Sequence, residues 1–258
     1  MIPRVFHQVW IGSKPVPDRL RAWSETWLRF NPGWEHVLWA DHPAVHAGGP
    51  WTEVREFPPI INRWAYDHLP AYVGSRTAVA ARSDIIRYEI VVRHGGVYLD
   101  FDVECFRPIG DLLEGVRLFI ADEYGPANGN YMFGAAPNHP AMWDLVRDLG
   151  RNFGAEHAKV YANETRPARW RRWVMRGPRP WFWNVLALTG PQYLNRTLPR
   201  HPECVVFPWQ LFNPLNAWHD PAKVTNWPDS CYGNHHFAGT WYDRNKSDPP
   251  AEFMLPNE

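Results

Sequence analysis

The sequence lacks an excess of charge of either sign. Its 258 residues carry 27 basic and 27 acidic side chains, so the formal net charge is zero. A neutral chain has no electrostatic footprint for nucleic acid or for an anionic membrane surface, and we expect neither as a partner. No internal repeat or low-complexity tract interrupts the chain.

Long apolar runs and cysteines are also scarce. The first residues, MIPRVFHQVW, lack the apolar run of a signal peptide, and no window approaches the length of a membrane span. Cys105, Cys204 and Cys231 have no metal-type spacing and cannot all pair, which fits a reducing compartment. We therefore expect a cytoplasmic protein and treat its N-x-S/T sequons as chance.

Apolar and aromatic side chains, by contrast, are plentiful. The hydrophobic share of 45% is ample for a packed core, and the length suits one large α/β domain. The number of tryptophans, 16, is unusually high. The flat face of a Trp ring is a good platform for sugars and bases. For most of them, packing in the core remains the simpler expectation.

The order of predicted elements indicates an α/β protein. A strand over 2–10, a helix over 18–30 capped by Asp18, and a strand over 34–39 form a βαβ unit, which predicts parallel strands with helices on both faces. Residues 44–59 are rich in Gly and Pro and are expected to be loop. The other predicted elements are helices over 60–69, 75–94 and 139–150, and strands over 97–99, 117–121 and 204–207.

The stretch GGVYLDFDVECF, residues 95–106, carries the main chemical signal. Asp100 and Asp102 follow a buried strand, and in extended chain both carboxylates share one face while Phe101 packs inward. The economical partner for such a pair is a hard divalent cation that also holds phosphate oxygens. The alternative is a solvated turn at the strand end, because an Asp-x-Asp triplet is common by chance.

The helix before this triplet carries a second candidate pair. Asp84 and Arg87 are three residues apart and therefore share a helical face. A carboxylate and a guanidinium together match the hydrogen-bonding needs of sugar hydroxyls. The alternative is an internal ion pair that ties the helix to its neighbour.

Five blocks, in order along residues 2–241, resemble a known family. They are IPRVFHQVWIG, NPGWEHVLWAD, RSDIIRYEIVVRHGGVYLDFDVECFRPI, Thr189-Gly190-Pro191 and HHFAGTW. The chain resembles the DXD-containing sugar transferases, such as initiating mannosyltransferases, capsular-polysaccharide glycosyltransferases and, distantly, the clostridial glucosylating toxins. The resemblance implies a GT-A fold, with a Rossmann-like mixed sheet flanked by helices. We expect one catalytic domain over 1–258, with an acceptor-side excursion around 152–180.

The resemblance also implies a cofactor and its ligands. Mn²⁺, or Mg²⁺, would be held by Asp102, by Asp100 indirectly, and by one of two adjacent histidines. Adjacent residues on a strand point opposite ways, so only one of these histidines should face the metal. We favour His236 over His235 for this position.

Further roles follow from the same resemblance. Asp84 and Arg87 would hold the donor sugar and act, with Asp100 and Asp102, as the catalytic residues. Val9 and Trp10 would contact the nucleobase. The remaining expected residues are Tyr98 and Asn130 at the sugar, and Asp100, Thr240 and Trp241 at the nucleotide.

The predicted function is metal-dependent, retaining transfer of a hexose from a nucleotide-diphosphate sugar to a glycan, lipid-linked or small-molecule acceptor. A UDP-sugar is favoured over GDP-mannose as the donor. One alternative is a glycoside hydrolase with Asp100 and Asp102 as its acid and base, although two carboxylates two residues apart suit chelation better. Another is a non-catalytic carbohydrate-binding protein, which would need neither the Asp84–Arg87 pair nor the two aspartates at a metal.

Overall fold

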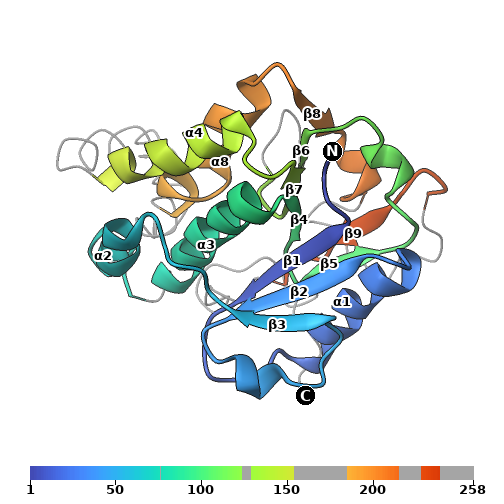
Figure 1. Ribbon diagram of the computed structural model, residues 1–258, viewed down its shortest axis with the longest axis horizontal. Helices are drawn as coiled ribbons and strands as arrows, with labels where there is room; N and C mark the ends of the chain where they lie inside the picture. Colours follow the sequence, from blue (N-terminus) through green and yellow to red (C-terminus); the bar gives the residue numbers. More distant parts are fainter. Residues whose placement is uncertain (76, 124–128, 154–184, 215–227, 239–258) are drawn as a thin grey trace, which may run out of the picture.

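Figure 1 shows the computed structural model of the protein, which describes residues 1–75, 77–123, 129–153, 185–214 and 228–238. The strands are β1 (Val5–Trp10), β2 (Glu35–Ala40), β3 (Glu53–Glu56), β4 (Gly96–Leu99), β5 (Val103–Cys105), β6 (Leu118–Ala121), β7 (Met132–Ala135), β8 (Cys204–Phe207) and β9 (Gly233–His235). The α-helices are α1 (Asp18–Phe30), α2 (Arg63–Val73), α3 (Ala78–His94), α4 (Pro140–Leu149) and α8 (Pro191–Thr197).

Seven strands of the described ranges form one mixed sheet in the order β3-β2-β1-β4-β7-β6-β8. β1 is parallel to β2 and β4, and β6 is parallel to β8, whereas β7 runs antiparallel to both β4 and β6. The other six strands therefore share one direction, and the carboxyl ends of β1, β4 and β6 meet at one edge. The predicted βαβ unit and mixed Rossmann-like sheet are confirmed.

Alternation along the strands divides the core between the two faces of the sheet. Tyr98 of β4 packs with α3 and α4, while its neighbours Val97 and Leu99 pack on the other side with Trp27 of α1. Figure 1 shows α3 and α1 on these opposite sides. A strand buried on both faces reads as a continuous apolar run, which is why this strand was predictable.

The helix α3 is the central support of the site. It is buried along most of its length and ends where Gly95, at a φ of 67°, donates its N–H to the carbonyl of Val91. The spacing of Val79, Ile86 and Ile90 predicts a shared apolar face, but Val79 is exposed and only the other two are buried. The expected capping role of Asp18 in α1 is also wrong: the helix begins at Asp18, and Pro17 occupies the cap position.

Two segments differ from the predicted elements. Residues 53–56 form the edge strand β3, although 44–59 is predicted as loop, because the sequence EVRE is short and polar as edge strands are. The helix α2 begins three residues later than expected and continues past Pro70. Most of the expected excursion at 152–180 lies outside the described residues.

No helix in the described ranges has the length and apolar character that a bilayer crossing needs. The cytoplasmic location stays a prediction.

Candidate functional site

Asp100 and Asp102 lie at the carboxyl edge of the sheet, directly after β4. The N–H of Asp100 donates to the carbonyl of Tyr131 at 2.7 Å, and Oδ2 of Asp102 accepts from the N–H of Ala238 at 2.7 Å. Phe101 between them is buried. The two carboxylates lie in one cluster, but residues 101–102 form a turn and not the extended chain that was expected.

A histidine joins the two aspartates. One potential ligand atom from each of Asp100, Asp102 and His235 lies within 4.8 Å of the others. The small β5–β9 sheet brings His235 there, because it pairs Val103 with His235. Nε2 of His235 is 3.4 Å from Oδ1 of Asp102. Carboxylate oxygens and an imidazole nitrogen in one cluster are a suitable donor set for a divalent cation.

The preference for His236 at this position is not supported by the geometry. Nε2 of His236 is 2.9 Å from Oε2 of Glu104, and its ring stacks on Trp23 with centroids 4.1 Å apart. Because the two histidines are adjacent in an extended segment, only one can face the aspartates. The register of β5 against β9 selects His235, and this register is not visible in the sequence.

The two aspartates differ in their electrostatics. Burial raises the pKa of Asp100, against the charge of Arg87. Burial also disfavours the charged form of Asp102, but the charge and hydrogen bonding of His235 outweigh this and lower the pKa of Asp102 below its ordinary value. For His235, burial opposes the cationic form, yet Asp102 and Glu123 together raise its pKa. Asp102 is thus the more strongly ionised carboxylate of the pair.

A further carboxylate, which the sequence analysis missed, belongs to this cluster. Glu123 follows β6 at the same edge of the sheet, and its Oε1 is 3.6 Å from Nδ1 of His235. Burial raises the pKa of Glu123 to about 7, against the charge of His235 and with that of Asp100. A strand at 117–121 followed by an acidic residue was the available signal, since carboxyl ends of parallel strands converge.

Asp84 and Arg87 lie inside the protein beside the aspartates. Their side chains are 7% and 8% exposed, and NH2 of Arg87 is 3.4 Å from Oδ1 of Asp84. Asp84 also accepts from Asn130 Nδ2 at 2.9 Å and from Thr189 Oγ1 at 2.8 Å. NH1 of Arg87 is 3.0 Å from Oδ1 of Asp100. The predicted pair is therefore connected directly to the Asp-x-Asp segment.

Tyr98 and Asn130 complete this network. The hydroxyl of Tyr98 donates to Oδ1 of Asp100 at 2.6 Å, and the guanidinium of Arg87 lies 4.3 Å from the centroid of the Tyr98 ring. NH1 of Arg87 donates to the carbonyl of Asn130 at 2.9 Å. Five of the expected site residues thus form one hydrogen-bonded group.

The expected nucleobase residues lie at the end of β1, on the same edge of the sheet. Val9 is buried, whereas Trp10 is partly exposed and meets Phe101 edge to face at 5.3 Å. Its indole N–H donates to the carbonyl of Lys14 at 2.8 Å. Their contact with a base stays a prediction. Thr240 and Trp241 lie outside the described residues.

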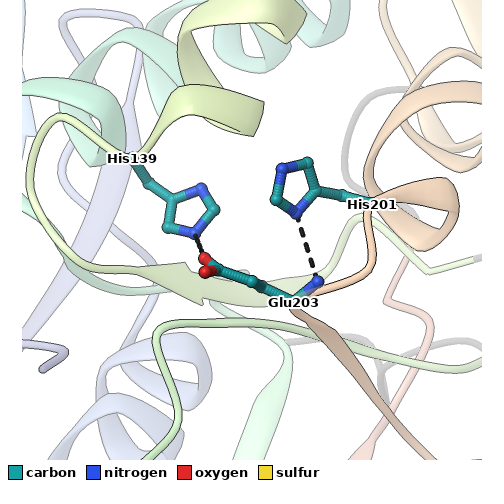
Figure 2. A group of neighbouring side chains, drawn as sticks. All are labelled: His139, His201 and Glu203. Carbon is teal, nitrogen blue, oxygen red and sulfur yellow. Dashed lines mark hydrogen bonds and ion pairs between the residues drawn. The ribbon is translucent and has the colours of Figure 1, made fainter.

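A second His-containing group lies at the opposite edge of the sheet (Figure 2). His139, His201 and Glu203 also bring potential ligand atoms within 4.8 Å of one another. However, Nδ1 of His139 accepts from the N–H of Ala141 at 3.2 Å, so Nε2 carries the proton that it donates to Glu203 at 2.9 Å. A metal at Nε2 would require the other tautomer. The group is therefore a hydrogen-bonded link between α4 and β8.

The order and directions of the strands, with carboxylates at their carboxyl ends, are those of the GT-A fold. The structure of PaToxG Glycosyltransferase superposes with a TM-score of 0.53 at 18% identity, over 76% of this chain and 69% of that chain. The ligand-free glycosyltransferase domain of the YGT toxin superposes with a TM-score of 0.50 at 13% identity, over 80% and 79%. These likenesses confirm the GT-A fold.

The sequence comparisons are more specific. Residues 17–123 match the family model "Glycosyltransferase sugar-binding region containing DXD motif", which confirms the predicted resemblance. The "Uncharacterized glycosyltransferase L373" of Acanthamoeba polyphaga mimivirus is 32% identical over 153 residues, covering 58% of this chain and 56% of that protein. Inositol phosphoceramide mannosyltransferase 1 of Schizosaccharomyces pombe is 28% identical over 248 residues, covering 95% and 66%. The chain thus spans only part of the length of these relatives.

Proposed function

We propose that the protein is a metal-dependent, retaining glycosyltransferase that moves a hexose from a nucleotide-diphosphate sugar to a hydroxyl acceptor. The observation that carries the proposal is the convergence of Asp100, Asp102 and His235 at the carboxyl edge of the sheet, directly against the buried Asp84–Arg87 pair. Nucleotides bind at this edge in open α/β sheets. The relatives, glycosyltransferases by name, support the same reading.

The donor set fits a hard divalent cation, Mn²⁺ or Mg²⁺. Asp102 and His235 would hold it, with Asp100 taking part indirectly because its Oδ1 is already bonded by Arg87 and Tyr98. When bound, such a cation would offset the negative charge that develops on the leaving diphosphate. The convergence of three donors that share one small space is the structural support for this proposal.

The residues on α3 would position the sugar. Asp84 can accept from sugar hydroxyls and Arg87 can donate to them, which orients the anomeric carbon toward the acceptor. In the proposed front-face reaction the bond from the anomeric carbon to the diphosphate oxygen breaks, and a bond to the acceptor oxygen forms on the same face. The acceptor proton passes to the leaving diphosphate, so that no covalent enzyme intermediate is needed.

The donor and acceptor are the finer part of the proposal. A UDP-sugar is the expected donor, but GDP-mannose is a second candidate, since several relatives are mannosyltransferases by name. A human relative over 28% of the chain is an N-acetylglucosaminyltransferase by name, which leaves UDP-sugars as candidates. A glycan, a lipid-linked glycan and a small molecule remain the acceptor classes.

The experiment is a donor panel with a matched control. The purified protein is incubated with Mn²⁺ and with UDP-glucose, UDP-galactose, UDP-N-acetylhexosamines or GDP-mannose, and the released nucleoside diphosphate is measured. We expect one donor to be turned over by the wild type but not by Asp102→Asn. The control is Glu203→Gln, which removes a carboxylate paired with His139 at the opposite edge of the sheet and should keep turnover. Turnover that persists in Asp102→Asn, or in EDTA, would contradict the proposal. The anomeric configuration of the product tests retention.

A further inference from the structure

The histidine of the candidate metal cluster has a carboxylate on each side. Nε2 of His235 faces Oδ1 of Asp102 at 3.4 Å, and Nδ1 faces Oε1 of Glu123 at 3.6 Å. The Nδ1 atom is buried and has no hydrogen-bond partner within ordinary distance among the described residues. A buried polar nitrogen that points at a carboxylate, and is just short of a hydrogen bond to it, calls for a functional reason.

The ring of His235 is otherwise fixed by its neighbours. It stacks on Tyr131 with centroids 4.4 Å apart, and Phe237 covers it with centroids 4.0 Å apart. The stacking sets the plane of the ring but leaves its tautomer open. The tautomer is therefore decided by what the two ring nitrogens meet within that plane.

The backbone at Glu123 is held in place by two contacts that do not involve His235. The N–H of Asp122 donates to the carbonyl of Phe207 at 2.9 Å, and the side-chain amide of Asn213 donates to the carbonyl of Glu123 at 2.7 Å. The side chain of Glu123 is 16% exposed, and its Oε1 faces Nδ1 of His235 while Nε2 of the same ring faces Asp102. Metal-binding histidines commonly donate their second N–H to such a carboxylate, which fixes the tautomer and makes the ligand nitrogen more basic.

We propose that Glu123 is a positioning residue that accepts the Nδ1–H of His235 and so holds the Nε2 lone pair toward the metal shared with Asp102. This inference rests on the metal dependence of the proposed function and assigns a role to a residue outside the two predicted pairs, Asp84–Arg87 and Asp100–Asp102. The neighbouring histidine provides an internal comparison. His236 also meets a carboxylate, Glu104, but through Nε2 at 2.9 Å and away from the aspartates.

The test compares Glu123→Gln with Glu104→Gln. Each variant replaces one histidine-paired carboxylate by its isosteric amide. Free Mn²⁺ is measured by electron paramagnetic resonance in titrations of the protein alone, with UDP, and with GDP. We expect Glu123→Gln to weaken Mn²⁺ binding about 10- to 100-fold, whereas Glu104→Gln should leave it unchanged. A second measurement, ¹⁵N NMR of histidine-labelled wild type with Mg²⁺, should show His235 protonated at Nδ1, with His235→Gln giving the assignment.

The outcomes separate the inference from the proposed function. Equal Mn²⁺ affinity in the wild type and Glu123→Gln, or an equal loss in both variants, would overturn the role of Glu123 alone. A wild-type His235 protonated at Nε2 in the presence of Mg²⁺ would overturn it even if Glu123→Gln failed to fold. If the wild type bound no Mn²⁺ with either nucleotide, the metal dependence of the proposed function would fall, and this inference with it.

Discussion

Arg87 links three carboxyl-bearing or polar groups that lie far apart in the sequence. It contacts Asp84 one turn away, Asp100 at the end of β4, and the carbonyl of Asn130. A purely structural ion pair would need only one of these contacts. The guanidinium of Arg87 therefore ties α3 to the Asp-x-Asp segment. A contact with a donor sugar would be a further role.

We predict that Asp84→Asn and Arg87→Lys lower turnover of the best donor about 100-fold or more, because misplacement of a reacting centre is costly. The affinity for UDP or GDP alone should stay close to that of the wild type, since the bare nucleotide lacks the sugar. The measurements are turnover, calorimetric affinity and melting temperature. Arg93→Lys, on the same helix and beside Glu89, is the control. Near-normal turnover with a loss of about 3–5 kcal/mol of stability would instead identify a structural ion pair.

Trp10 is partly exposed and also packs against a core cluster that includes Phe101, so a role as a base platform and a role in packing give different predictions. Trp10→Ala should weaken nucleotide binding by about 1–3 kcal/mol, the usual range for stacking of a base on an aromatic ring. Trp10→Phe should restore much of the loss, because the flat face is kept. Calorimetry of the folded protein measures both effects. A large fall in melting temperature with unchanged affinity would assign Trp10 to packing.

Single residues also mark where prediction from sequence stops. The two predicted pairs were identified because the members of each are close in sequence, Asp84 and Arg87 on one helix and Asp100 and Asp102 just after one strand. Glu123 was missed because its partner, His235, is more than a hundred residues away, and only the pairing of β5 with β9 brings them together. The same long-range register decides between His235 and His236.

Among the elements, the junction from α3 to β4 determines where the aspartates lie. Both Gly95 and Gly96 have positive φ, at 67° and 89°, so the chain can leave the helix and enter the sheet within two residues. A Cβ on Gly96 would lie 2.7 Å from the carbonyl oxygen of Val5 on the adjacent strand. The glycine thus lets β4 approach β1 closely.

Gly96→Ala should therefore destabilise the protein by more than the roughly 1–2 kcal/mol expected for a non-glycine residue with positive φ, because backbone contact adds to the strain. Gly115→Ala is the matched control: its φ is 72°, but a Cβ there has nothing within 4 Å. Chemical denaturation of both variants gives the comparison. Equal losses of stability would mean that close packing at Gly96 has no cost.

Elements with strong local signals were predicted well. The bounds of α1 and β8 agree with the sequence, since each is an apolar pattern between breakers. The strands β3 and β7 were not predicted, because a polar edge strand and a short strand after a Gly-containing loop have weak local signals. The antiparallel direction of β7 depends on contacts with β4 and β6 that no local pattern shows.

For the whole molecule, buried histidines on β1 and β2 predict instability in acid. Burial lowers the pKa of His36 to about 3, because the fully buried ring is costly to charge. The unfolded chain then binds a proton that the folded chain does not, so stability is full above about pH 6.5 and is lost as the pH falls toward 3. His36→Gln should reduce the slope of unfolding free energy between pH 4 and 6 by about 1.4 kcal/mol per pH unit. The unfolding free energy is measured by urea denaturation at each pH. Equal slopes against pH for the wild type and His36→Gln would contradict the assignment of this proton to His36.

The central claim is that the edge formed by β1, β4 and β6 binds a nucleoside diphosphate through a divalent cation held by Asp102. The most direct measurement is calorimetric titration of UDP and GDP into the wild type and Asp102→Asn, each with Mn²⁺ and then with EDTA. Asp102→Asn removes the repulsion with Asp100 but also the pairing with His235, so the melting temperature of the variant is measured first and affinity is compared for the folded protein. We predict that at least one nucleotide binds the wild type with Mn²⁺, and that its affinity falls sharply in EDTA and in Asp102→Asn. Equal affinity in all four conditions would contradict the account.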